Sequence, residues 1–228
     1  MIQLVNLSKK YGTNEVLKAI TLKFEAGIVY GIVGQNGAGK TTLFQCMAGL
    51  ESYSGTIETV SKTALKNTLG YLQTDPFFFD YCTGREYIQL LGNARGIAEI
   101  DFAACNIFQL PLNEYAINYS TGMKKKLALT AILVQQNQAF ILDEPFNGVD
   151  LEGNILLVGT IQKLKAMGKT VLISSHIFST IKETCDVVIH LEQGTISGIY
   201  SKNEFAQLEQ QMQAAILGKD TQIFDFLH

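Results

Sequence analysis

Apolar residues along the chain recur in two patterns, and together they predict an order of strands and helices. Short runs rich in β-branched residues predict strands at 2–7, 16–24, 28–33, 56–60, 69–72, 139–142, 171–174, 187–191 and 195–200. Helix-like patterns cover 40–49 and 151–167, a block from about 83 to 136 in which apolar residues recur three and four apart, and the tail from 202. Strands therefore flank a helical block.

This order of elements predicts an α/β protein with a parallel sheet at its centre. We expect one domain over residues 1–228, with an antiparallel β subdomain at its N-terminal end. The helical block predicts an inserted helical subdomain at about 81–138, and the last residues, about 202–228, predict a C-terminal tail.

Composition excludes several classes of protein. The chain has 228 residues, 47% hydrophobic and 17% charged, with a formal net charge of −3. A disordered protein has fewer apolar residues, and a protein that binds nucleic acid over its whole surface is basic. The charged fraction is below the roughly 25% typical of soluble domains. Either a large core or surfaces covered by partners would explain that deficit.

Location is also constrained by the sequence. No apolar run approaches the roughly 18 to 20 residues that cross a bilayer, and the N-terminus lacks the pattern of a secretory signal. The scattered positions of Cys46, Cys82, Cys105 and Cys185 predict free thiols in a reducing cytoplasm rather than a zinc or disulfide framework.

Residues 34–41 read GQNGAGKT and match G-x-x-x-x-G-K-[ST] between a predicted strand and a predicted helix. Glycines let backbone N–H groups surround phosphates, the helix start adds a positive field, and the lysine supplies a mobile cation. The motif predicts a nucleoside-triphosphate site in which Thr41 ligates Mg²⁺. The expected nucleotide-binding residues here are Gly34, Asn36, Gly37, Ala38, Gly39, Lys40, Thr41 and Thr42.

A second candidate is the carboxylate pair Asp143 and Glu144, which ends the predicted strand at 139–142. In an open parallel sheet ligands bind beyond the carboxyl ends of the strands, so both acids should reach the same rim as the phosphate loop. Adjacent strand residues point to opposite sides. We therefore expect Asp143 to hold Mg²⁺ and Glu144 to polarise the attacking water. Alone, the pair could equally be a solvated turn before Pro145.

With five further features, the chain resembles the ATP-binding cassette (ABC) ATPases, the nucleotide-binding subunits of ABC transporters, over about residues 1–200. The resemblance implies that Tyr11 stacks on adenine and that Gln73 contacts Mg²⁺ and water. It implies that His176 contacts the γ-phosphate, and that Asp150 is the acidic residue of the D-loop 146–150. The implied catalytic residues are Glu144, His176 and Gln73, and the implied cofactors are ATP and Mg²⁺.

The signature motif departs from the family pattern L-S-G-G-Q, since residues 119–123 read YSTGM. Ser120 and Gly122 remain, and the resemblance implies that they meet the γ-phosphate held by an opposite subunit. Thr121 adds a Cβ where a close approach is wanted. The lysines at 124–126 then form either a solvated helix face or a phosphate-directed cluster, because cations oppose the dipole at a helix start.

The resemblance implies partners as well as chemistry. It predicts a second ABC ATPase subunit, homodimeric or heterodimeric, and a multi-spanning permease at the inner face of the cell membrane, with export favoured by the form of the signature. No nucleic acid is expected. Phe77, Phe78 and Phe79 would either pack in the core or receive a helix of the permease. The competing readings are a soluble ABC ATPase acting on ribosomes or DNA, and a non-enzymatic nucleotide-binding regulator.

Overall fold

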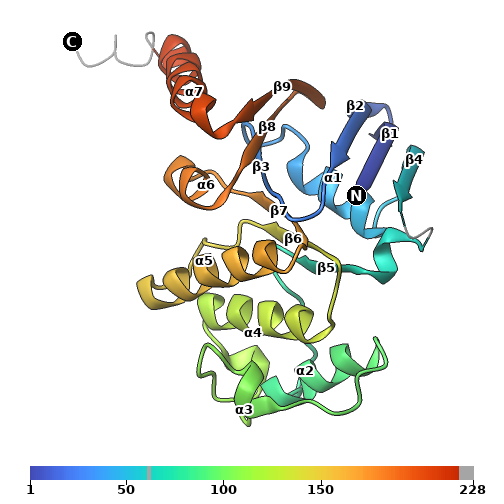
Figure 1. The fold of residues 1–228 in the computed structure, drawn as a ribbon, viewed down its shortest axis with the longest axis vertical. Coiled ribbons are helices and arrows are strands. Elements are labelled where there is room, and N and C mark those ends of the chain that lie inside the picture. The colour runs from blue at the N-terminus through green and yellow to red at the C-terminus, as the bar shows by residue number, and fades with distance from the viewer. Residues whose placement is uncertain (61–62, 221–228) are drawn as a thin grey trace.

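Two sheets organise the computed structural model, which describes residues 1–60 and 63–220 (Figure 1). The larger sheet has the order β5-β6-β7-β3-β8-β9, and all of its pairings are parallel except the antiparallel β8–β9 pair. Its strands are β3 (Val29–Val33), β5 (Leu69–Leu72), β6 (Ala139–Asp143), β7 (Thr170–Ser174), β8 (Val187–Glu192) and β9 (Thr195–Ser201). The smaller sheet is antiparallel, with β1 (Ile2–Tyr11) between β2 (Asn14–Phe24) and β4 (Ser54–Thr59). The predicted α/β class and the antiparallel N-terminal sheet are confirmed.

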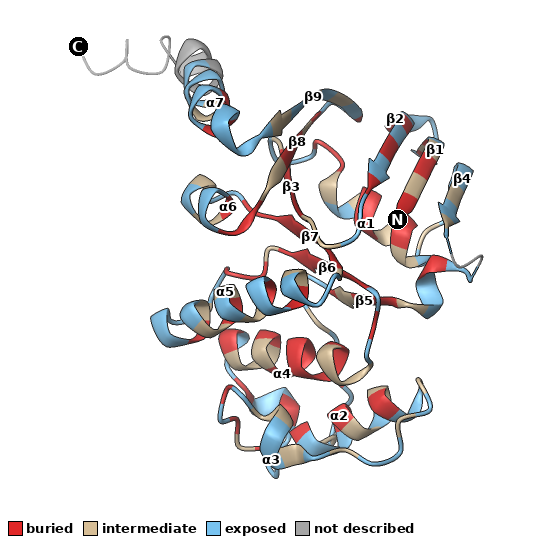
Figure 2. Ribbon diagram, in the orientation of Figure 1, coloured by how far each residue is buried: buried red, intermediate tan, exposed pale blue. Residues whose placement is uncertain are grey.

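Helices cover both faces of the larger sheet. They are α1 (Lys40–Ala48), α2 (Gly84–Asn93), α3 (Phe102–Cys105), α4 (Thr121–Val134), α5 (Leu151–Ala166), α6 (Phe178–Thr184) and α7 (Phe205–Asp220). Three 3₁₀ turns, η1 (Leu65–Asn67), η2 (Ala116–Asn118) and η3 (Lys202–Glu204), connect them. The buried residues of α1 join the antiparallel sheet in one hydrophobic cluster, and those of α4 and α5 form another. The helices α1 and α4 therefore contribute to different hydrophobic clusters, and Figure 2 shows buried residues on both.

The central strands are buried throughout, as their apolar runs predict. Every residue of β3, β6 and β7 is buried, because helices lie on both faces of these strands. Since these strands are parallel, their carboxyl ends meet at one edge of the sheet. That edge carries Gly34 after β3, Asp143 and Glu144 at the end of β6, and Ser174 at the end of β7.

The helical block is less regular than its periodicity suggests. Between β5 and β6 the chain forms α2, the single turn α3, η2 and α4, separated by loops, and these elements lie together at one end of the molecule (Figure 1). Helix α4 is buried on nearly all sides. Helix α2 begins with a capping box between Thr83 and Glu86. The boundaries 81–138 of an inserted subdomain remain a prediction.

Two details at the C-terminal end differ from the sequence-based expectation. Helix α6 was not predicted, because it has only seven residues, too few for its apolar positions Phe178 and Ile181 to establish a helical period in the sequence. The tail is helical as expected, from η3 into α7, while residues 221–228 of the predicted tail lie outside the described residues. Within residues 1–60 and 63–220 no helix is long and apolar enough to cross a membrane.

Candidate active site

The glycine-rich loop joins β3 to α1. At Gly34 and Gly39 it packs so closely on β8 and β2 that no side chain fits there. Gly34 has φ 157°, and a Cβ there would overlap the carbonyl oxygen of Leu191 in β8. Gly39 has φ 107° and caps α1, where a Cβ would come within 2.9 Å of a Leu17 methyl group. Only glycine fits either position, because both backbone angles and both contacts exclude an L side chain.

A second glycine contact supports the loop from behind. Gly194, in the β8–β9 turn, donates its backbone N–H to the Ala38 carbonyl at 3.2 Å and accepts one from Lys18 at 2.9 Å. A Cβ at Gly194 would overlap the carbonyl oxygen of Val16. The loop is therefore held between the N-terminal sheet and the C-terminal hairpin.

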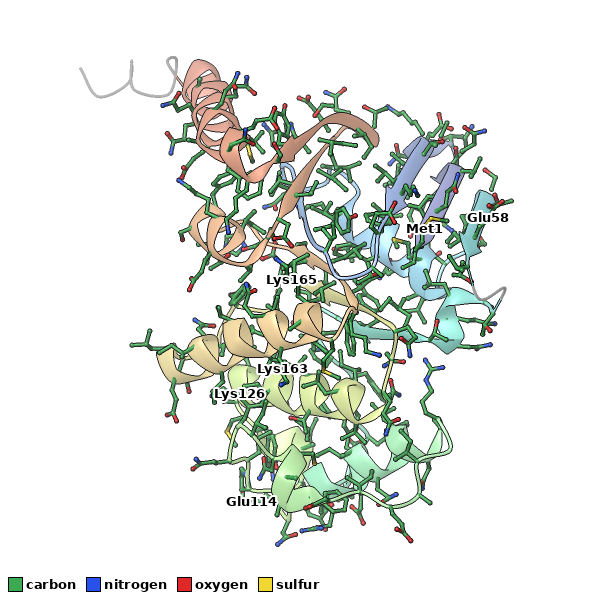
Figure 3. All side chains as sticks on the ribbon, in the orientation of Figure 1. Met1, Glu58, Glu114, Lys126, Lys163 and Lys165 are labelled. Atoms are coloured by element: carbon green, nitrogen blue, oxygen red, sulfur yellow. The ribbon has the colours of Figure 1, made fainter. Side chains whose placement is uncertain are left out.

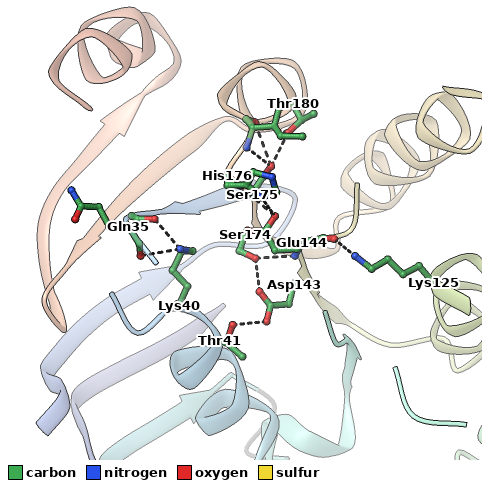
Figure 4. Close-up of polar contacts among 12 residues, drawn as sticks. Gln35, Lys40, Thr41, Lys125, Asp143, Glu144, Ser174, Ser175, His176 and Thr180 are labelled. Carbon is green, nitrogen blue, oxygen red and sulfur yellow. Dashed lines mark hydrogen bonds and ion pairs between the residues drawn. The ribbon is translucent and has the colours of Figure 1, made fainter. Parts of the chain in front are cut away.

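Lys40 is the first residue of α1, and its side chain reaches back to the start of the glycine-rich loop. Its ammonium donates hydrogen bonds to the carbonyl oxygens of Gly34 at 2.8 Å and Gln35 at 3.2 Å (Figure 4). Burial lowers the pKa of Lys40, and the nearby carboxylates of Glu144 and Asp143 oppose that shift. The cation and the first turn of α1 together provide a positive field for phosphate.

Asp143 is a carboxylate buried at the end of β6, with 1% of its surface exposed. One carboxylate oxygen accepts a hydrogen bond from Thr41 Oγ1 at 2.9 Å, and the other accepts one from Ser174 Oγ at 2.5 Å (Figure 4). Thr41 and Asp143 therefore supply neighbouring hydroxyl and carboxylate oxygens, the donors that Mg²⁺ prefers, and they fit that ion. Full ligation by protein is unnecessary, since Mg²⁺ sites use few side chains together with phosphates and water.

Glu144 and His176 meet beside this carboxylate. His176 Nδ1 lies 2.8 Å from Glu144 Oε2, and the His176 backbone N–H donates to the same oxygen at 3.4 Å. The Glu144 backbone has φ 51°, in the left-handed region that residues other than glycine rarely adopt. Its own N–H donates to Ser174 Oγ at 2.9 Å, so one buried hydroxyl fixes both acids.

Two residues around Asp143, Ser174 and Tyr71, were not predicted from the sequence. Ser174 is fully buried, and its only sequence signal was its place at a strand end close to His176. Tyr71, on β5, faces the same carboxylate, and burial together with Asp143 raises the pKa of its phenol. The predicted Gln73 follows β5 directly and is exposed, beside the end of β6 but without a hydrogen bond in the described part of the chain.

Tyr11 lies at the end of β1 with its ring 43% exposed. The ammonium of Lys9 lies 4.7 Å from the ring centroid, a cation–π contact. Lys9 is itself buried and pairs with Glu51 at 2.8 Å, which raises the pKa of the lysine. The aromatic ring is thus held in place from one side.

The signature residues begin α4. Ser120 caps this helix, because its Oγ accepts the Met123 backbone N–H at 3.2 Å. Gly122 packs directly on the D-loop, where a Cβ would lie 2.5 Å from the Gly148 carbonyl oxygen. In Figure 1, α4 and α1 lie apart with β5 and β6 between them, and the hydrogen bond of Ser120 Oγ is to its own helix.

The three lysines that follow the signature have three different environments. Lys125 is buried and donates to the main-chain carbonyl of Glu144 at 2.6 Å. Lys126 forms an ion pair with Asp150 at 2.9 Å, reaching from α4 toward the start of α5 (Figure 3). The Lys124 side chain forms no hydrogen bond or ion pair within residues 1–60 and 63–220. Neither a uniform solvated face nor a uniform phosphate-directed cluster describes the run.

The three consecutive phenylalanines separate in the same way. Phe78 is 6% exposed and packs on Tyr87 at 4.6 Å between ring centroids. Phe77 and Phe79 are 68% and 51% exposed and form an edge-to-face pair at 5.2 Å. Core packing is therefore confirmed for Phe78 only, and a role of the exposed Phe77 and Phe79 in receiving a helix of the permease stays a prediction.

These features define a phosphate-loop nucleotide-binding protein. They are a parallel sheet with a glycine-rich loop, a lysine at the helix start, and a buried Asp beside a Glu–His pair. Comparison with known proteins narrows this class. The family model described as "ABC transporter" matches residues 17–147. This chain is therefore a member of the ABC transporter ATP-binding family, and it is an ATPase of that family.

Individual relatives agree with this assignment. The chain is 32% identical to the bacitracin transport ATP-binding protein BcrA of Enterococcus faecalis, over 99% of this chain and 80% of BcrA. It is 32% identical to the ABC transporter ATP-binding protein NatA of Bacillus subtilis, over 86% of this chain and 87% of NatA. In fold it is similar to the ATP-binding cassette MJ0796, solved as a post-hydrolysis dimer with ADP and Pi, with a TM-score of 0.77 at 17% identity. That match covers 89% of this chain and 99% of MJ0796.

Proposed function

We propose that this chain hydrolyses ATP for a membrane exporter whose permease is a separate subunit. The observation that carries the proposal is the hydrogen-bonded set Thr41–Asp143–Ser174–Glu144–His176, which lies at the mouth of the phosphate loop. At one rim, this set brings together Asp143 for metal binding, Glu144 for activating water, and His176 for orienting Glu144. These are the parts that phosphoryl transfer to water requires.

Nucleotide binding falls to the loop and to Tyr11. The backbone N–H groups of residues 34–39 surround the phosphates, and Lys40 turns from its carbonyl partners to the β- and γ-phosphates. The first turn of α1, including Thr42, adds its field to the same anion. The exposed face of Tyr11 stacks on adenine, while Lys9 holds the other face.

Thr41 and Asp143 would hold Mg²⁺ together with Gln73, which lies at the end of the neighbouring strand. Bound there, the ion would neutralise charge on the β- and γ-phosphates. Ser174 keeps the Asp143 carboxylate oriented toward Thr41.

Glu144 acts as the base that orients and polarises the attacking water. Its carboxylate is 18% exposed and lies against His176 Nδ1, so its orientation is fixed on one side and open on the other. His176 positions Glu144 and contacts the γ-phosphate. A carboxylate within hydrogen-bond reach of water fits general-base catalysis.

Hydrolysis requires two cassettes. Ser120 is exposed at the start of α4, which lies apart from α1 in Figure 1, and this supports a role for Ser120 and Gly122 toward the γ-phosphate held by a second subunit. ATP then closes two cassettes face to face, and hydrolysis lets them separate. The copy that pairs with this chain is a second cassette, identical or related.

Phe77, Phe79, Tyr81 and Tyr115 form the surface that meets the permease at the inner face of the membrane. These four residues are 45–81% exposed. The first three follow Gln73 in the sequence, and the ring of Tyr115 packs edge-on against Tyr81 with 5.9 Å between the ring centroids. Exposed aromatic side chains suit a groove for an amphipathic helix. The form of the signature, with Met123 and Lys124 after Gly122, supports export as the direction of transport.

The proposal is tested by replacing Glu144 with Gln. We expect Glu144→Gln to bind ATP with unchanged affinity, to accumulate as an ATP-bound dimer in gel filtration, and to lose about 10²–10⁴-fold in turnover. Glu183→Gln, which removes an exposed acid from α6, is the matched control and should behave as the wild type. Fast hydrolysis by Glu144→Gln would exclude the proposed role.

A further inference from the structure

A buried cation lies behind the catalytic turn, and the nucleotide-binding set does not include it. Lys125, on α4, is 3% exposed. It borders a small apolar cavity of about 10 Å³ that is also lined by Leu72, Phe108, Leu129, Pro145 and Leu157. Lysine is almost never fully buried without a partner, since desolvating the ammonium is unfavourable.

The partner of this ammonium is a backbone carbonyl rather than a carboxylate. Lys125 Nζ donates to the Glu144 carbonyl oxygen at 2.6 Å (Figure 4). Burial lowers the pKa of Lys125, and the nearby carboxylates of Glu144, Asp75 and Asp143 oppose that shift. The carboxylates therefore favour the charged form of Lys125, but its hydrogen bond is to the main-chain carbonyl of Glu144.

That main chain is in an unfavourable conformation. Glu144 has φ 51°, which a side chain with a Cβ adopts only when its surroundings impose it. The turn is held at its N–H by Ser174 Oγ and at its carbonyl by Lys125, with a longer bond from the Asn147 N–H at 3.3 Å. Removing the lysine leaves the carbonyl with the weaker of its two donors.

We propose that Lys125 is a positioning residue for Glu144: from the signature helix it fixes the left-handed turn that directs the Glu144 carboxylate toward the nucleotide. This inference rests on the proposed catalytic role of Glu144. Lys125 acts through the turn, because its ammonium donates to the main-chain carbonyl of Glu144.

The placement of Lys125 has a further consequence. Its helix starts with Ser120 and Gly122, and the adjacent Lys126 binds Asp150 at the other end of the turn–D-loop segment. The signature helix therefore holds residues 144–150 at both ends.

The test measures turnover and ATP binding separately in Lys125 variants of the full chain. We expect Lys125→Met to lower kcat on the order of 10- to 100-fold, as small displacements of a catalytic group do. Affinity for a fluorescent ATP analogue should stay within about twofold, because the phosphate loop is untouched. Lys125→Arg, which keeps a cationic donor, should regain a large part of the rate.

A double variant shows whether Lys125 acts through Glu144. In the Glu144→Gln background, Lys125→Met should lower the residual rate no further, because residues that act as a unit are non-additive. Lys124→Met removes one charge from the same turn without touching Glu144 and should keep kcat within about twofold of the wild type.

Four results would overturn the proposal: full turnover in Lys125→Met, parallel loss of ATP affinity and kcat, additive losses in the double variant, or an equal loss in Lys124→Met. Melting temperatures identify any variant that fails to fold. If Lys125→Met unfolds, Lys125→Leu, which likewise removes the donor to the Glu144 carbonyl, takes its place under the same criteria. Fast turnover of Glu144→Gln alone would instead refute the proposed function, so the two failures are distinguishable.

Discussion

The rim at the carboxyl ends of β3, β6 and β7 differs in character from the surface formed by the signature and the exposed aromatic residues. At the rim, each acidic group is anchored within the chain, as Asp143 is by two hydroxyls. On the other surface, Ser120, Phe77 and Tyr81 are exposed and lie at the edge of the packed core.

The difference separates two tasks within one chain. A catalytic group must be fixed before the substrate arrives, since preorganised dipoles need no rearrangement during reaction. A docking group must instead remain uncovered until its partner covers it. The first three of the four predictions that follow test whether the two regions can be damaged independently, and the fourth concerns a helix cap outside both. They start with the largest expected change in stability.

The sharpest contrast is between adjacent phenylalanines. Phe78→Ala should lower the free energy of unfolding by about 3–5 kcal/mol, because it removes a buried ring. Phe77→Ala should change it by less than about 0.5 kcal/mol, since that ring is exposed. Urea unfolding measures both, and co-purification with the permease should fall only for Phe77→Ala. Equal destabilisation would mean that the outer rings also belong to the core.

Ser174→Ala tests the anchoring of the rim. It removes a donor to buried Asp143 and the acceptor of the Glu144 N–H, so we expect a loss of about 1–3 kcal/mol in stability. Turnover should fall more than ATP affinity does, because the loop is intact. Ser175→Ala, which alters a neighbouring buried hydroxyl bonded only to residues 177 and 180, is the control. A wild-type rate in Ser174→Ala would show that the strand alone fixes the acids.

Ser120→Ala tests the outward-facing signature. Loss of its cap should lower stability by about 0.5–2 kcal/mol. ATP binding by isolated monomers, measured by fluorescence at low protein concentration, should be unchanged, while ATP-driven dimerisation and turnover should fall. Weaker binding by the monomer would mean that the signature contacts its own nucleotide, and the division into two regions would fail.

The smallest effect concerns the capping box of α2, far from both the loop and the rim. Its hydrogen bonds to Thr83 lower the pKa of Glu86 below the usual 4.5. A lowered pKa in the folded state means that the stabilisation is present above about pH 4.5 and is lost as pH falls through the lowered value. Glu86→Gln should therefore reduce the melting temperature slightly at pH 7 and less at pH 3.5. A constant difference would assign the effect to packing.

The sequence predicted the parts of the site that rest on local chemistry. The phosphate loop needs glycine at positions where the backbone angle or a close contact demands it, so Gly34 and Gly39 are recognisable from the motif alone. The apolar runs of the central strands also predicted which strand ends would meet. Asp143 and Glu144 could be placed at the rim for that reason.

What the sequence did not predict depends on contacts between distant segments. Ser174 looks like any serine at a strand end until β6 and β7 pair and bring it against Asp143. The left-handed turn at Glu144 is likewise imposed by partners on β7 and α4. The separation of three identical lysines into half-buried (Lys124), buried (Lys125) and ion-paired (Lys126) positions has the same origin, since local composition treats them alike.

The glycine of the β8–β9 turn has a consequence for the order in which the protein matures during synthesis. Because Gly194 joins the phosphate loop to strand β2, the loop gains its rear support only after residue 194 has been made. A nascent chain that ends before residue 194 carries the full motif of the loop without the hairpin that backs it. The backing of the phosphate loop thus depends on a segment that is made more than 150 residues after the loop itself.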